Sequence, residues 1–199
     1  VKGEGLATSG EFIANNRAIP PASDPALLEL LRASVACNDA ELVITDAQIV
    51  MVGDPTEGAL LVAAAKAGIN RADIEAVMPR IDALPFDSDR KRMTVIRRTD
   101  NGATAFVKGA PETVLARCTR IRGAGGVVHM TDELRSAMNQ SVRMLAEDAL
   151  RVLAIAERPD ITGYQTNAGG PDADHIEAGL TLLGLIGLQD PPRVEARAA

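Results

Sequence analysis

Several aromatic, basic and glycine residues stand at the ends of predicted strands, where they could act together on one ligand. Phe86 ends an apolar strand before the charged run 87–91, Lys108 and Gly109 join a strand to a helix, and Arg151 begins a later strand. An aromatic ring can stack on a base, at ~1–3 kcal/mol per base, and arginine grips phosphate through its planar fork. Glycine lets the backbone come close to a ligand. These residue types predict a pocket for an adenosine phosphate.

Each of these residues also has a purely structural interpretation. Phe86 could be a core residue, and Lys108 could be an ordinary surface lysine. Glu57, in the first turn of the predicted helix 55–67, could serve only to complement the helix dipole, worth ~0.3–1 kcal/mol. Lys91 could belong to a solvated run of charges. From the residues alone, both interpretations stay open.

Capping signals and apolar spacing predict the elements that position these residues. Asp24 and Asp54, each followed by proline, start two helices, and the spacing of Leu27, Leu30, Leu31 and Val35 gives the first helix one apolar face. The first helix ends at 38–39 and the second covers 55–67, with Gly68 just beyond it. The remaining predicted elements are strands 81–86, 93–96 and 103–107 with a hairpin turn at Asn101-Gly102, helix 111–117, a turn at 123–126, helix 131–148, strand 151–156, a polar loop over 158–178, and strand 180–188. The pattern over residues 1–22 predicts only a short strand or an extended segment.

The order of the predicted elements indicates the fold class. Hairpins outnumber β-α-β units, so we expect an α+β domain with helices on the faces of an antiparallel sheet.

Composition excludes several classes of function. The chain has 199 residues, 46% of them hydrophobic, which fits one domain or two small ones with a real core. Its net charge of −6 argues against non-specific nucleic-acid binding. The longest apolar run, 180–188, is about half the length of a membrane span. Two cysteines, Cys37 and Cys118, cannot build a disulfide scaffold.

Motifs for catalysis or metal binding are incomplete. Residues 53–58 have the glycine spacing of a P-loop, but Ala59-Leu60 stand where a P-loop needs lysine and a hydroxyl. His129 and His175 are too isolated to form a metal site. Cys37 has no histidine close in sequence to activate it as a nucleophile. We therefore expect no catalytic group and no metal site in this chain.

Seven groups of residues, read in order, resemble the nucleotide-binding (N) domain of P-type cation-transporting ATPases, in the calcium-pump-like branch. They are residues 3–5 with 10–12, 36–40, 53–60, 85–93, 108–112, 151–154 and 190–193. A single group is a weak signal, but seven groups in the order in which the family has them are specific for this family. They span almost the whole chain, and its Arg- and Ala-rich composition indicates a bacterial source.

The resemblance implies a role for each pocket residue. Phe86 matches the ring that stacks on adenine, and Glu57 the acid at the edge of adenine. Lys91 matches a basic residue near base and phosphates, and Arg151 an arginine that reaches the phosphates. The remaining matches are Lys108 and Gly109 of the Lys-Gly-Ala motif and Leu153, which packs on base or ribose.

The resemblance also divides the chain and places it in a larger protein. Residues 1–189 match the N domain, without the family's first strand and hinge, and 190–199 match the hinge (Asp190, Pro191, Pro192 and Arg193) and the start of the phosphorylation domain. The family's phosphorylated Asp-Lys-Thr-Gly-Thr motif, its Mg²⁺-binding Gly-Asp-Gly motif and its membrane helices are absent. We therefore expect a fragment that binds ATP without turnover.

In the intact pump, the domain would present the γ-phosphate of ATP, bound with Mg²⁺, to an aspartate of another domain. Its partners would be the phosphorylation, actuator and transmembrane domains, on the cytoplasmic side of the cell membrane, with no nucleic acid and no membrane insertion of its own. The alternative is an interaction or regulatory domain with the same fold and a degenerate nucleotide site. Because all the pocket residues are present, binding is the favoured hypothesis.

Overall fold

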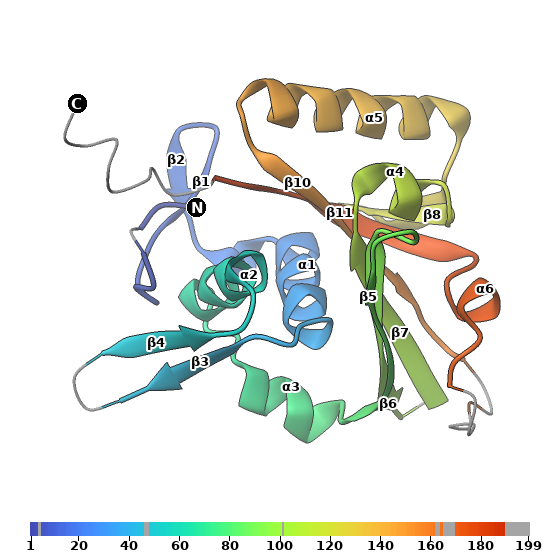
Figure 1. Cartoon of the computed structure of the whole chain (residues 1–199). Helices are drawn as coiled ribbons and strands as arrows, with labels where there is room; N and C mark the ends of the chain where they lie inside the picture. Colours follow the sequence, from blue (N-terminus) through green and yellow to red (C-terminus); the bar gives the residue numbers. More distant parts are fainter. Residues whose placement is uncertain (4, 46–47, 101, 162–163, 165–169, 190–199) are drawn as a thin grey trace.

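A seven-stranded sheet forms the centre of the computed structural model, which describes residues 1–3, 5–45, 48–100, 102–161, 164 and 170–189 (Figure 1). Its strands, in spatial order, are β5 (Arg80–Asp87), β6 (Arg92–Thr99), β7 (Gly102–Gly109), β10 (Arg151–Arg158), β11 (Leu180–Leu188), β8 (Cys118–Gly123) and β9 (Gly126–His129). Neighbouring strands are antiparallel except β11 and β8, which are parallel. The predicted α+β class is confirmed, with one parallel pair in an otherwise antiparallel sheet.

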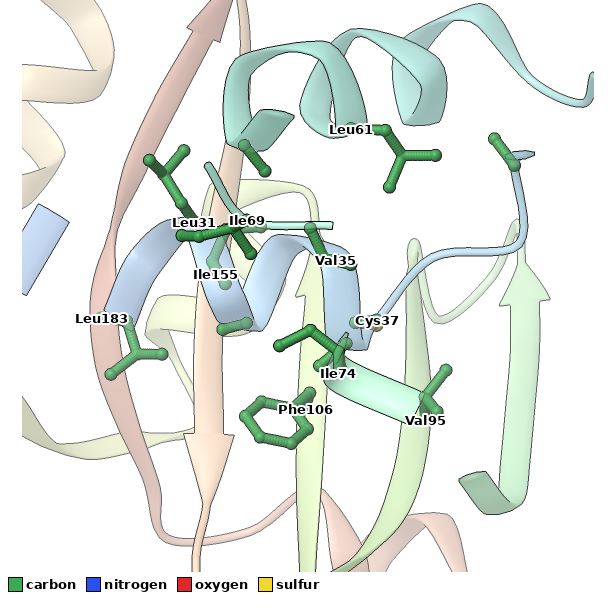
Figure 2. Packing of buried hydrophobic residues seen from close by; sticks show 14 of the residues in the cluster. Leu31, Val35, Cys37, Leu61, Ile69, Ile74, Val95, Phe106, Ile155 and Leu183 are labelled. Atoms are coloured by element: carbon green, nitrogen blue, oxygen red, sulfur yellow. The ribbon is translucent and has the colours of Figure 1, made fainter. Parts of the chain in front are cut away.

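Helices cover both faces of this sheet. On one face, α1 (Pro25–Ala36), α2 (Pro55–Lys66) and α3 (Arg71–Val77) pack on β6, β7, β10 and β11. Figure 2 shows Leu31 and Val35 of α1 in this cluster with Phe106 and Ile155 of the sheet. On the other face lie α4 (Pro111–Leu115), α5 (Asp132–Glu147) and α6 (Ala173–Ile176). No helix among the described residues has the length and apolar character needed to cross a bilayer.

The predicted helix starts are confirmed at atomic detail. The Asp24 carboxylate accepts a hydrogen bond from the amide of Leu27 at 3.1 Å, and the Asp54 carboxylate accepts one from Thr56 at 2.8 Å. Gly68, just beyond α2, has a φ of +75°, a conformation that favours glycine at a helix C-terminus. The second of these helices begins at the site described below.

Two hairpins and two helices were not predicted as such. They are the hairpin β1 (Phe12–Ala14) with β2 (Arg17–Ile19), the hairpin β3 (Glu41–Ile44) with β4 (Ile49–Val52), helix α3, and helix α6 within the predicted polar loop. A short 3-10 helix (Pro21–Ser23) precedes α1. The β3–β4 hairpin packs against α2 at Gly58, where a Cβ atom would lie 1.8 Å from Sδ of Met51. Asn101 and the predicted hinge 190–193 lie outside the described residues.

A buried arginine fixes the end of α1, from which the chain runs into the site. Arg97 donates from Nε to the Ala36 carbonyl at 2.7 Å and from Nη1 to the Met78 carbonyl at 2.8 Å. It also forms an ion pair with Glu75 at 2.9 Å, and this interaction with Arg97 holds the pKa of Glu75 below its ordinary value, against a smaller opposing effect of burial. The loop that follows α1 is therefore anchored before it reaches the site.

Candidate functional site

A cavity of about 620 Å³ lies where the start of α2, the β5–β6 turn, the end of β7 and the start of β10 meet. All seven residues predicted from the sequence line it: Glu57, Phe86, Lys91, Lys108, Gly109, Arg151 and Leu153. Asp39, Asp54, Thr56, Met93, Ala110 and Val152 complete the lining. The volume is within the ~300–1,000 Å³ that is usual for small-molecule pockets.

A bulge in β5 presents the ring of Phe86. Leu84 pairs with Thr94 and Asp87 pairs with Arg92, so Pro85 and Phe86 together face one residue of β6. Such a bulge bends the strand and re-aims a side chain. Phe86 is 66% exposed although it is apolar and lines the cavity. Its ring is therefore available to stack on a flat ligand.

The turn after β5 places Lys91 at the mouth of the cavity. The Asp87 carboxylate accepts hydrogen bonds from the amides of Asp89 (3.0 Å) and Arg90 (2.8 Å), which hold the pKa of Asp87 below its ordinary value. Lys91 has a φ of +51°, an uncommon conformation for a residue with a side chain. Its Nζ lies 3.4 Å from Oε1 of Glu112, and both side chains are exposed.

Lys108 and Glu57 form an ion pair inside the cavity. The distance from Nζ to Oε1 is 2.5 Å, and the side chains are only 7% and 14% exposed. The other carboxylate oxygen of Glu57 accepts from the amides of Asp39 and Ala40, both at 3.0 Å. Glu57 therefore has three donors, and Lys108 keeps further N–H groups for a ligand.

Asn38 connects this ion pair to α1. Its fully buried side chain donates to the carbonyl of Glu57 at 3.0 Å and to that of Ser34 at 3.3 Å, and accepts from the amide of Ala40 at 2.9 Å. The end of α1 and the first turn of α2 are thus held together. The position of Glu57 is set by this connection rather than by its own helix alone.

Gly109 is required by close packing beneath the cavity. A Cβ atom at this position would lie 2.5 Å from both Cβ of Arg92 and the carbonyl oxygen of Lys91. That carbonyl also accepts a hydrogen bond from the amide of Ala110 at 2.9 Å. The absence of a side chain at 109 lets the β5–β6 turn lie against the β7–α4 junction.

Arg151 reaches across the cavity to the start of α2. Its Nη1 donates to the hydroxyl of Thr56 at 3.1 Å. Partial burial raises the pKa of the nearby Asp54, but hydrogen bonds from Thr56 and Glu57 and the charge of Arg151 outweigh it, so the pKa lies below its ordinary value. Sequence spacing had marked Asp54 as a helix cap, but nothing in it connected Thr56 with Arg151, which lies 95 residues away.

Replacing Asp54 with alanine is expected to lower the free energy of unfolding by ~1 kcal/mol, the usual value of such a cap. In a chain of this size the loss corresponds to about 2–4 °C in Tm. Asp54→Asn, which keeps the cap but not the charge beside Arg151, should lose less Tm at pH 7 than Asp54→Ala. The lowered pKa means that the Asp54 contribution is fully present well above pH 3.8 and lost as the pH falls below it. Thermal unfolding of both variants at pH 7 and pH 3 checks this, and equal Tm losses for alanine and asparagine at pH 7 would contradict it.

Cys37 lies behind the cavity, and its environment does not favour a reactive thiolate. Burial raises the pKa of Cys37 to about 11, so its thiol stays protonated at neutral pH, and the thiol lies 3.6 Å from the carbonyl of Met93. Among the residues described by the structure, no three His, Cys, Asp or Glu side chains gather as a metal site would require. The groups that the cavity does offer are an exposed ring, three cations and three carboxylates, of which Glu57 is paired with Lys108 inside it.

The fold is that of an α+β domain, and its cavity has the size of a small-molecule pocket. The chain belongs to the family described as "P-type ATPase, cytoplasmic domain N", which matches residues 26–195. The resemblance inferred from the seven groups of residues is thereby confirmed.

The relatives are cation-transporting ATPases. The chain is 37% identical over 200 residues to the "Calcium-transporting ATPase" of Bacillus subtilis and 38% identical over 198 residues to the "Cation-transporting ATPase pma1" of Synechocystis sp.. It is 31% identical over 203 residues to the human "Calcium-transporting ATPase type 2C member 1". Each match includes the whole of this chain but only 20–22% of the relative, so the chain spans about a fifth of the length of these proteins.

Proposed function

We propose that this chain is the ATP-binding domain of a membrane cation-transporting P-type ATPase and that the cavity described above holds the nucleotide. The observation that carries the proposal is the convergence of Phe86, Lys91, Lys108 and Arg151 from separate elements on one cavity. An exposed ring with cations arranged around it suits a ligand that has both a flat base and phosphates. A structural role alone gives no reason to leave Phe86 exposed at a cavity.

The burial of the cations suggests how the nucleotide lies. Lys108 is buried with Glu57, and we assign their end of the cavity to the base. Phe86 would stack on adenine, and Leu153 would pack on the base or the ribose. Lys91 and Arg151 are exposed, and we assign them to the phosphates. Their positive charges offset the carboxylates of Asp39 and Asp54 and the net charge of −6, which would otherwise repel ATP.

The rest of the proposal concerns the intact pump. Residues 1–189 would form the N domain, and 190–199 the hinge and the start of the phosphorylation domain. The bound γ-phosphate would be presented to an aspartate of that domain, on the cytoplasmic side of the membrane, and the actuator and transmembrane domains would complete the pump. The described residues offer no ligand set for Mg²⁺, so the metal would arrive with ATP. Two of the relatives described above are named as calcium-transporting ATPases, and we propose a calcium-like cation.

An amide-resolved NMR titration of this chain with ATP, and separately with adenosine, tests the proposal. We expect shifts to cluster at Glu57, Phe86, Lys91, Lys108 and Arg151, with a Kd near millimolar, about −4 kcal/mol. One stacking ring and a few polar contacts provide no more binding free energy than this. A folded spectrum that does not change at several millimolar of either ligand would favour the interaction-domain alternative.

Replacing Arg151 with alanine is expected to weaken ATP binding about 5- to 10-fold and to leave adenosine binding unchanged. The reason is that a charged, solvent-exposed contact to phosphate is worth roughly 1 kcal/mol. Arg151→Lys should recover part of the loss, because the charge returns without the planar fork. Titration of both ligands checks this, and an equal loss for adenosine would place Arg151 at the base instead.

A further inference from the structure

A fully buried carboxylate stands behind the candidate site. Glu177, which caps the C-terminus of α6, has an exposed fraction of 0%. Its Oε1 accepts from Nη1 of Arg90 and from Oγ1 of Thr94, and its Oε2 accepts from Nε of Arg92, all at 2.6 Å. A buried charge is tolerated only when it is paired and hydrogen-bonded. All three donors belong to one short segment of the chain, residues 90–94.

Glu177 lies on the face of the sheet opposite the cavity. The register of β6 with β7 is regular from Arg92 to Thr99, so Arg92 and Thr94 point to one face and Met93 to the other. Met93 is the register partner of Lys108, and both line the cavity. Glu177 therefore holds the reverse side of β6, the strand that carries Met93 to the cavity.

The hydrogen bonds of Glu177 extend into the turn that carries Phe86 and Lys91. Arg90, held by Glu177, also donates from Nη2 to the carbonyl of Pro85 at 2.7 Å. Arg92 donates from Nη1 to the carbonyl of Arg90 at 2.8 Å. Both ends of the turn are thus fixed to one carboxylate, with Phe86 directly after Pro85 and Lys91 between the two arginines.

We propose that Glu177 is a positioning residue for the nucleotide: through Arg90 and Arg92 it holds the 85–91 turn in the conformation that presents Phe86 and Lys91 to the cavity. The proposal rests on the proposed function. Glu177 touches neither the cavity nor a ligand in it, and its effect is preorganisation of the turn, which lowers the ordering cost of binding. If the turn spends only about a tenth of its time in the binding conformation, the apparent Kd rises about tenfold.

Glu177→Gln tests this, because it keeps the volume and removes the charge that holds two arginines. With the folded variant well below its Tm, we expect binding of ATP and of adenosine to weaken by the same factor, about tenfold. We also expect the NMR order parameters of the 86–91 amides to fall while those of Lys108 and Gly109 stay unchanged. Glu157→Gln is the matched control, since Glu157 is an arginine-paired carboxylate near the far end of β10 and does not line the cavity.

If Glu177→Gln does not fold, Arg90→Met decides, because it releases Pro85 and leaves the Arg92–Glu177 pair in place. If a folded variant kept the same affinity and the same order parameters of the 86–91 amides, the proposal for Glu177 would be overturned and the proposed function would stand. A loss of the same size in Glu157→Gln would overturn it too, since a general loss of stability would then be the cause. Absence of binding by the unmodified chain would instead overturn the proposed function, and the role of Glu177 in nucleotide binding with it.

Discussion

Phe86→Ala is expected to weaken binding of ATP, AMP and adenosine by one common factor, about 5- to 140-fold. The three ligands share adenine, and base stacking on a ring is worth ~1–3 kcal/mol, with ~1.4 kcal/mol per tenfold in Kd. The ring is 66% exposed, so its removal creates no core cavity and should change Tm little. NMR titration with each of the three ligands gives the factor, or a lower bound on it where the variant does not reach saturation.

Two variants control for the effect of losing an apolar side chain. Phe86→Tyr keeps a ring on the same bulge and should retain binding. Val77→Ala removes another exposed apolar side chain, at the end of α3 and outside the cavity, and should change nothing. If Phe86→Ala bound adenosine as well as the unmodified chain does, the stacking role would be wrong. A loss for ATP alone would mean that the residue acts near the phosphates.

The structure decides between interpretations that the sequence left open for single residues. Phe86 is not a core residue, because most of its ring is exposed. Lys108 is not a surface lysine, because it is 6% exposed and paired with Glu57. Glu57 is in the first turn of α2, but its carboxylate bonds to Lys108 and to the loop after α1 rather than to its own helix. Lys91 does lie in a solvated turn, at the edge of the cavity. The binding roles of all four stay predictions.

Local signals were sufficient for the elements whose ends are marked by caps, prolines or tight turns. Asp24 and Asp54 gave α1 and α2, and the predicted strands 81–86, 93–96 and 103–107 correspond to β5, β6 and β7, each somewhat longer. The hairpin of β3 with β4 was missed because four-residue apolar runs do not distinguish strand from other buried structure. The parallel pairing of β11 with β8 depends on residues some 60 positions apart, such as Leu182 and Ile121, and no local pattern specifies it.

The candidate site shows the same division between local and distant information. The residue types, their spacing along the chain and the resemblance to the N-domain family together predicted seven of the residues that line the cavity. The contacts that hold these residues were not predictable, because they join distant segments: Asn38 to Glu57, Arg151 to Thr56, and Glu177 to Arg90. A prediction from motifs can thus name the groups that face a ligand while missing the groups that position them.

Lys108→Met is expected to lower the free energy of unfolding by about 2 kcal/mol at pH 7. Breaking a fully buried ion pair costs ~3–5 kcal/mol, because the remaining charge is left without its partner. The cost here should be smaller, since the Glu57 carboxylate is 14% exposed and keeps the amides of Asp39 and Ala40 as donors. A loss of this size corresponds to about 4–8 °C in Tm for a chain of this length. Thermal and urea unfolding without ligand measure it.

A double-mutant cycle separates the ion pair from the other contacts of the two residues. In Lys108→Met with Glu57→Gln no unpaired charge is left, so the double variant should recover part of the stability lost in Lys108→Met. We expect a coupling of roughly 1–2 kcal/mol, within the range found for residues in contact. Additivity within ~0.3–0.5 kcal/mol would show that the pair does not stabilise the fold in solution. Lys108 would then be free for the ligand, and its loss should weaken nucleotide binding without lowering Tm. If the pair is coupled, the affinity for nucleotide and Tm should fall together.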